Sequence, residues 1–104
     1  MDDEQGDEKV VVGKDNSIFI GNKPFMNYVT SVVMQFTTKD ADEVIVKARG
    51  KFISRAVDVA EVARKRFLTD QVEIKDILVD SEEFTNKEGK LVRVSTIEIV
   101  LNKK

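Results

Sequence analysis

Two stretches of this chain each pass from a short β-branched run into a pattern of helical spacing. The first is a strand-like run at residues 17–21 followed by helical spacing over 24–37, where Pro24 suits a first helical turn. The second is a strand-like run at 43–49 followed by a long helical pattern over 51–68. Two successive strand–helix units predict a right-handed crossover and two parallel neighbouring strands.

Apolar residues at helical spacing predict the buried face of each helix. In the first helix they are Met26, Val29, Val32, Val33 and Phe36. In the second helix they are Ile53, Ala56, Val57, Ala60, Ala63 and Phe67.

The last part of the chain alternates apolar and polar residues with the period of β-strands. The apolar positions are Val72, Ile74, Ile77 and Val79 in one run and Val92, Val94, Ile97, Ile99 and Leu101 in the next. Each run changes phase once, after Ile74 and after Val94, which predicts a β-bulge in each strand. Residues 86–89 between the runs are a turn signal. The predicted fold is an α+β two-layer sandwich of the α/β class, with the order βαβαββ. Two helices cover one face of a four-stranded mixed sheet, and a long C-terminal hairpin projects from it.

Length and charge predict one domain with an acidic extension. A chain of 104 residues can bury a single core. Residues 1–16 hold six acidic residues and two lysines without a clear amphipathic pattern, although residues 10–12 could pair weakly as an edge strand. We expect residues 1–16 to be a flexible tail and residues 17–104 to form the domain.

Composition argues against several classes of function. The chain has no cysteine and no histidine, which removes disulfides, thiolate nucleophiles, imidazole bases and the usual zinc sites. No apolar run approaches the ~20 residues of a membrane span, so we expect an intracellular protein with no membrane partner and no cofactor. Magnesium-dependent catalysis would need an acidic cluster, and both candidates lack a companion base: Asp40, Asp42 and Glu43, or Asp80, Glu82 and Glu83. We therefore expect a protein that is not an enzyme.

Positive charge is concentrated in one region although the net charge is −2. Residues 47–66 contain seven basic residues, namely Lys47, Arg49, Lys51, Arg55, Arg64, Lys65 and Arg66, against Asp58 and Glu61. Arg49 and Lys51 flank Gly50 where the strand gives way to a helix, and the free N–H groups of a first helical turn favour anions. A phosphate, and hence a nucleic acid, is the predicted ligand.

Four blocks of the sequence, in order and spacing, resemble the Alba family of archaeal chromatin proteins. They are residues 21–29 (GNKPFMNYV), 46–58 (VKARG and ISRAVD), 66–68 (RFL) and 93–99 (RVSTIEI). The resemblance covers about residues 17–104 and implies the same βαβαββ architecture. It also implies a homodimer whose hairpins reach along double-stranded DNA, nucleoid compaction, a cytoplasmic, chromosome-associated location, and RNA as an alternative ligand.

The resemblance implies that Lys23, Arg49, Lys51 and Arg93 contact nucleic acid. Lys87 and Lys90 flank the hairpin tip and are further candidates. Phe67 is predicted to be core by its spacing, while the resemblance adds a role in contacts between dimers. Asn22 replaces a second lysine before Pro24, which puts acetylation control in doubt. The segment 80–93 is net acidic, so we expect weaker and more salt-sensitive binding than in a strongly basic member.

Two other interpretations remain open at this point. Single-stranded RNA binding would need exposed aromatic residues, and Phe25, Phe52 and Phe84 are the candidates because the other aromatics fall in apolar stripes, Phe19 among them. A protein-interaction module would self-associate without binding any polynucleotide. Nothing in the chain predicts base-specific readout.

Overall fold

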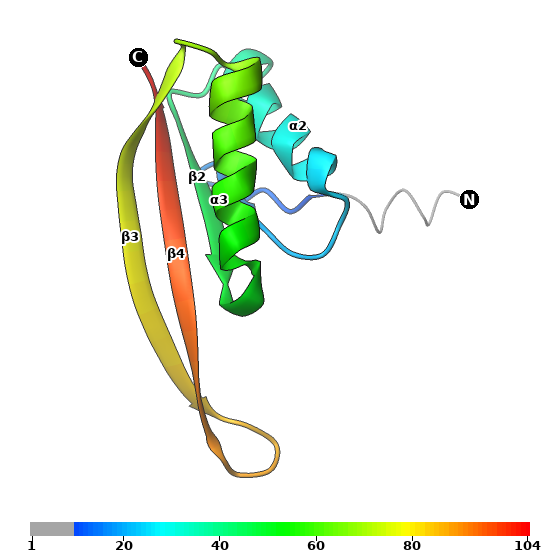
Figure 1. Ribbon diagram of the computed structural model, residues 1–104, viewed down its shortest axis with the longest axis vertical. Coiled ribbons are helices and arrows are strands. Elements are labelled where there is room, and N and C mark those ends of the chain that lie inside the picture. The colour runs from blue at the N-terminus through cyan, green and yellow to red at the C-terminus, as the bar shows by residue number, and fades with distance from the viewer. Residues whose placement is uncertain (1–9) are drawn as a thin grey trace, which may run out of the picture.

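The helices and strands of the computed structural model, which describes residues 10–104, follow the predicted order. They are β1 (Ser17–Phe19), α2 (Phe25–Thr37), β2 (Glu43–Arg49), α3 (Ile53–Val62), β3 (Val72–Thr85) and β4 (Leu91–Lys103). The sheet order is β1-β2-β4-β3, with β1 parallel to β2 and the other pairs antiparallel. The predicted βαβαββ order, mixed sheet and parallel first pair are confirmed (Figure 1).

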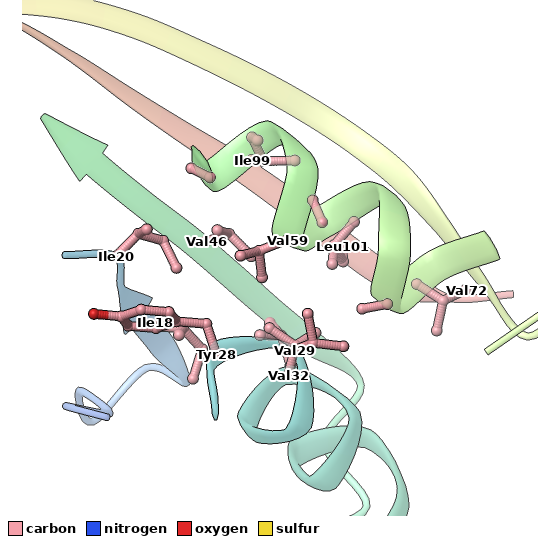
Figure 2. Packing of buried hydrophobic residues seen from close by; sticks show 14 of the residues in the cluster. Ile18, Ile20, Tyr28, Val29, Val32, Val46, Val59, Val72, Ile99 and Leu101 are labelled. Atoms are coloured by element: carbon pink, nitrogen blue, oxygen red, sulfur yellow. The ribbon is translucent and has the colours of Figure 1, made fainter. Parts of the chain in front are cut away.

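Both helices lie on one face of the sheet, and the core fills the space between the two layers. α3 packs on β2 and β4, while α2 packs on β1, β2 and α3. The buried residues come from all of these elements and include Ile18, Tyr28, Val29, Val32, Val46, Val59, Ile99 and Leu101 (Figure 2). Apolar burial of this kind is the main stabilising contribution to such a fold.

The buried faces of the two helices are narrower than predicted. Met26 in α2 and Val57 in α3 are 47% and 40% exposed, so the prediction that they are buried is wrong. The remaining members of both stripes are buried or packed against the core, apart from Phe67.

Phe67 is 50% exposed, and the prediction that it belongs to the core is wrong. α3 continues into a π-helical turn at Ala63–Phe67 (η2). There the N–H of Leu68 donates to the carbonyl of Ala63, five residues back, at 2.9 Å. A π-turn holds one more residue than an α-turn, so the inward position falls on Leu68, which is 1% exposed.

The C-terminal hairpin extends beyond the rest of the sheet. β2 ends at Arg49, opposite Thr96 of β4, whereas β3 and β4 stay paired as far as Thr85 and Leu91. We call residues 81–95 the arm, since they form the part of the hairpin that projects past β2 (Figure 1). At its tip the Asn86 side-chain oxygen accepts the N–H groups of Glu88 and Lys90, which confirms the predicted turn.

One of the two predicted bulges is present. The register of β3 against β4 shifts between Ile74 and Asp76, so Lys75 is the extra residue. The bulge predicted after Val94 is wrong, because pairing runs without a shift from Leu91 to Val100. The strand is regular there, so side chains three positions apart point to opposite sides of the sheet. Ile97 points to the helix side, and Val94 points to the other side.

The described part of the N-terminal extension runs beside β1. Val12 forms an isolated antiparallel bridge with Ile18, and Gly13 donates its N–H to the Ser17 carbonyl at 2.8 Å. Residues 1–9 lie outside the described residues. The expectation of a flexible acidic tail therefore stays a prediction.

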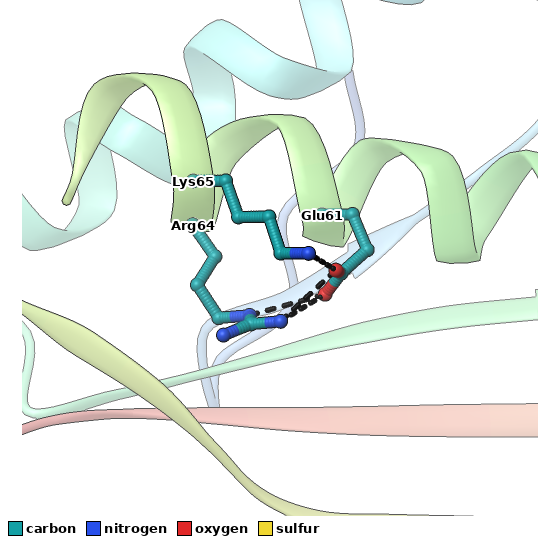
Figure 3. Close-up of polar contacts among 3 residues, drawn as sticks. All are labelled: Glu61, Arg64 and Lys65. Carbon is teal, nitrogen blue, oxygen red and sulfur yellow. Dashed lines mark hydrogen bonds and ion pairs between the residues drawn. The ribbon is translucent and has the colours of Figure 1, made fainter. Parts of the chain in front are cut away.

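Glu61 on α3 forms a compact ionic cluster with Arg64 and Lys65 (Figure 3). Arg64 Nη2 lies 2.7 Å from Glu61 Oε2, and Lys65 Nζ lies 3.2 Å from Oε1. The hydrogen bonds from Arg64 lower the pKa of the Glu61 carboxyl most strongly; partial burial opposes this, and Lys65 adds a smaller lowering.

We predict that Arg64→Gln raises the pKa of the Glu61 carboxyl towards its ordinary value. Because that pKa is lower in the folded chain than in the unfolded chain, the stabilisation is complete above the ordinary pKa of glutamate and is lost as pH falls through the lowered value. Titration of the carboxyl carbon by NMR measures the shift. Lys65→Gln is the control, and a rise as large as that of Arg64→Gln would contradict the assignment.

Candidate nucleic-acid interface

The junction between β2 and α3 presents two basic side chains at the base of the arm. Gly50 has φ of +61°, a left-handed conformation that residues with a side chain rarely adopt. It opens the short 3₁₀ turn Gly50–Phe52 (η1), which leads into α3. Arg49 and Lys51 on either side of it are both exposed. The sequence-predicted pair is therefore brought together in a turn whose shape depends on glycine.

The two cations of this junction have different surroundings. The Arg49 guanidinium lies 3.0 Å from a carboxylate oxygen of Glu82, at the base of the arm. Lys51 Nζ lies 5.4 Å from the centroid of the Phe52 ring and, within residues 10–104, forms no ion pair. A phosphate at this site would therefore meet one unscreened cation and one that must exchange a carboxylate.

The loop that carries Lys23 is held by groups that sequence reasoning did not select. The hydroxyl of Tyr28, which is 2% exposed, accepts the N–H groups of Gly21 at 2.9 Å and Lys23 at 3.1 Å. Arg55 of α3 donates to the Gly21 carbonyl at 2.8 Å. Its guanidinium also lies over the rings of Tyr28 and Phe25, at 5.6 and 6.0 Å from their centroids. The loop is thus fastened to both helices.

One signal in the sequence could have revealed the role of Tyr28. A tyrosine in the buried stripe of a helix must bring its hydroxyl to a hydrogen-bond partner, because an unpaired buried hydroxyl is costly. Arg55 had no comparable signal, since its spacing resembles that of any exposed basic residue on a helix.

The arm carries the other three candidates. Arg93 pairs with Glu83 across the two strands, with Nη2 2.6 Å from the carboxylate. Lys87 and Lys90 are exposed at the tip. Phe67 lies far along the chain from this site, at the end of α3 opposite the Gly50 junction. The structure therefore places Arg49 and Lys51 at the junction, Lys23 in the loop before α2, and the other three cations on the arm.

The sheet face opposite the helices, which we call the open face, carries an exposed aromatic ring. Phe19 is 44% exposed, so the prediction that it belongs to an apolar stripe is wrong. It pairs with Lys47 of β2, whose Nζ lies 5.7 Å from the ring centroid. By contrast, Phe25 and Phe52 pack partly against the core, and Phe84 is 44% exposed on the arm.

A hollow of about 390 Å³ lies on the open face beside Phe19. Its polar lining comes from β2, β3 and β4, namely Lys47, Arg49, Glu82, Thr96 and Glu98. Lys47 lies between two carboxylates, at 3.8 Å from Asp15 and 3.9 Å from Glu98. The hydrogen bond from Ser17 and, more weakly, the charge of Lys47 hold the pKa of the Asp15 carboxyl below its ordinary value.

Comparison with known proteins identifies the family. The Alba family profile matches residues 16–81. This chain belongs to the Alba family. Its relatives include the DNA/RNA-binding protein Alba 1 of Archaeoglobus fulgidus, 56% identical over 90 residues that make up 86% of this chain and 98% of the relative. The DNA/RNA-binding protein Alba of Nanoarchaeum equitans is 59% identical over 88 residues, 84% of this chain and 97% of the relative.

A solved structure supports the same assignment. Alba from Thermoplasma volcanium superposes with a TM-score of 0.76 at 48% identity, covering 84% of this chain and 99% of that one. The curated Alba relatives are named for binding DNA and RNA, not for catalysis, in line with the expectation of a non-enzymatic protein. The resemblance seen in the sequence is confirmed.

Several of the described acidic residues form ion pairs, and they do not gather into a metal site. In the first candidate cluster Asp40 pairs with Lys103, and Glu43 pairs with Lys75 at 3.5 Å. Across residues 10–104, no group of three acidic side chains could hold a metal ion. Over the same residues, no helix is long and apolar enough to cross a membrane.

We predict that Tyr28→Phe loosens the Lys23 loop while leaving the core packed. The N–H groups of Gly21 and Lys23 lose their acceptor, at a cost of about 1 kcal/mol in the free energy of unfolding. Hydrogen exchange by NMR should show both amides exchanging faster. The Ile20 amide, which donates to the Lys47 carbonyl at 2.9 Å, is the internal control. Unchanged exchange at Gly21 and Lys23 would contradict the role of the hydroxyl.

Proposed function

We propose that this Alba-family protein is a chromatin protein that binds double-stranded DNA as a homodimer, with little sequence preference. The body would contact phosphates through Lys23, Arg49 and Lys51, and the arm through Arg93, Lys87 and Lys90. The observation that carries the proposal is the position of Arg49 and Lys51, exposed on either side of Gly50 where the arm leaves the body. Body and arm could then engage one duplex together.

The shape of the molecule supports backbone contacts over base readout. The projecting arm is a two-stranded ribbon, a form that can follow a groove of DNA. The cations of the body lie in a loop and a tight turn, and none is presented by a recognition helix. The names of the relatives, which specify both DNA and RNA, support nucleic acid as the ligand class. Binding to the chromosome in the cytoplasm follows from this proposal.

Carboxylates of β3 would weaken this binding. Arg49 is paired with Glu82 and Arg93 with Glu83, so two of the six proposed contacts require a phosphate to displace a carboxylate. Exposed ion pairs of this kind are worth little in water, and the exchange is therefore feasible. Its cost supports the expectation of modest, strongly salt-dependent affinity.

We predict that the double change Arg49→Ala and Lys51→Ala weakens binding to duplex DNA by at least tenfold at moderate salt. Each lost phosphate contact should also make the slope of log affinity against log salt shallower by about 0.9. Fluorescence anisotropy across a salt series measures both quantities. Lys65→Ala, which removes an exposed lysine of η2 paired with Glu61, is the matched control. Equal losses in both proteins, or none in either, would refute the proposed site.

An exposed apolar strip on β3 supports the homodimer. α3 covers β2 and β4, and β3 is one of the two edge strands of the described sheet. Ile77 and Val79 pair with Ile99 and Ile97 and so point to the helix side, where they are 52% and 73% exposed. Exposed apolar strips on edge strands usually mark an interface. We propose that a second copy of this chain packs against this strip in the homodimer. The exposure of Phe67 would leave it available for contacts between dimers along DNA.

We predict that Val79→Asp dissociates the dimer, because it would bury an unpaired charge in the interface. Its neighbour Leu78 pairs with Glu98 and points to the open face. Leu78→Asp is therefore the matched control and should leave the dimer intact. Light scattering coupled to gel filtration measures the mass of each variant. A monomeric wild-type protein, or two variants that behave alike, would overturn the assignment of the interface.

A further inference from the structure

We propose that the open face binds one unpaired nucleotide, with its base against Phe19 and its phosphate near Lys47 and Arg49. The proposal rests on nucleic-acid binding as proposed above and adds single strands as a second kind of ligand. It follows from three features that meet at one place: an exposed aromatic ring, a hollow and two basic side chains.

The exposed ring lies outside the hydrophobic core. Phe19 ends β1 and points away from the core, and 44% of it is open to solvent. Neighbouring Ile18 and Ile20 point inward and are almost fully buried. A large aromatic group on a polar sheet face is the usual platform on which nucleic-acid-binding proteins stack a base.

The hollow beside the ring has the size of a small-ligand site. Its volume of about 390 Å³ lies within the range of about 300–1,000 Å³ that is typical of such pockets. The floor is formed by the strands themselves, with Ala48 of β2 and Ile97 of β4 among its lining residues. A floor built on paired strands is already in place before a ligand arrives.

The two cations are placed for the phosphate of the same nucleotide. Lys47 is directly paired with Phe19 in the sheet, and Arg49 is two residues further along β2, on the same face. The contacts of Lys47 with Asp15 and Glu98, at 3.8 and 3.9 Å, are longer than hydrogen bonds. A phosphate could therefore engage Lys47 without breaking a short hydrogen bond, whereas at Arg49 it would replace the carboxylate of Glu82, which lies 3.0 Å away.

The acidic and hydroxyl groups of the lining favour a nucleotide over a bare phosphate. Glu82, Thr96 and Glu98 can accept hydrogen bonds from the amino and imino groups of a base, while the two carboxylates repel a free anion. A base stacked inside a duplex cannot reach the ring, because its faces are covered by its neighbours. The ligand must therefore be a single strand or an unpaired nucleotide.

The test compares Phe19→Leu with Phe84→Leu. Both phenylalanines are 44% exposed, but Phe84 lies on the arm, so the comparison separates a stacking site beside Lys47 from a general loss of exposed aromatic surface. Anisotropy is measured with labelled single-stranded oligouridine, single-stranded oligothymidine and duplex DNA. Phe19→Leu should weaken binding of at least one single strand by about 5- to 50-fold and leave duplex binding unchanged. The more strongly affected strand shows whether RNA or DNA is the source of the nucleotide.

Ultraviolet crosslinking gives a second, direct readout that a purely structural role of Phe19 would not produce. Irradiation of the wild-type complex with oligouridine or oligothymidine, followed by peptide mapping, should place the adduct on Phe19. The inference is overturned if adducts occur only on the arm, or if Phe19→Leu and Phe84→Leu bind single strands equally well while duplex binding persists. Absence of binding to all three probes would instead remove the proposed function, and the nucleotide site with it.

Discussion

The pairing of β2 with β4 is the contact on which the rest of the structure depends. β2 has seven residues and β4 has thirteen, and every residue of β2 is paired with one of β4. This pairing joins the two halves of the chain and gives the helices a surface to cover. Within the described residues, the outer part of β4 is paired with β3 alone, so the arm begins where β2 ends. The Gly50 turn lies at that point, and a difference in strand length therefore sets both the arm and the basic junction beside it.

Several basic side chains of this protein lie next to carboxylates that would compete with a bound phosphate. Among the described residues, one cation in each region is matched with a carboxylate, as in Arg49 with Glu82 at the junction and Arg93 with Glu83 on the arm. At the paired cations, nucleic-acid binding would then be an exchange in which a phosphate replaces a carboxylate. Within residues 10–104, Lys51, Lys87 and Lys90 form no ion pair, and Lys51 lies against the ring of Phe52. The arrangement fits a protein that holds its ligand loosely at physiological salt.

Much of the fold could be predicted because apolar residues recur at a different spacing in its helices than in its strands. Strand and helix patterns alternate clearly, and the order, the parallel first pair and the hairpin all follow from them. Phe67 could not be predicted, since a helical wheel assumes a constant turn and the π-turn moves the inward position to Leu68. Phe19 was missed because three apolar residues in a row do not reveal which one faces solvent. The cations were evident as residue types, but their carboxylate partners and the fastening of the Lys23 loop depend on contacts between distant segments.

The bulge at Lys75 has a consequence for the two ends of β3. Ile74 and Ile77 are separated by an odd number of positions, which in a regular strand would place them on opposite faces. The extra residue restores the phase, so the body end and the outer end of the strand present their isoleucines to the same side. Because of this one inserted residue, the apolar side chains at both ends of β3 point to the helix side. Those at the body end pack against this chain's core, and those at the outer end are left exposed for a neighbouring molecule. The orientation of the outer strip can accordingly be maintained even though the strand changes surroundings halfway along its length.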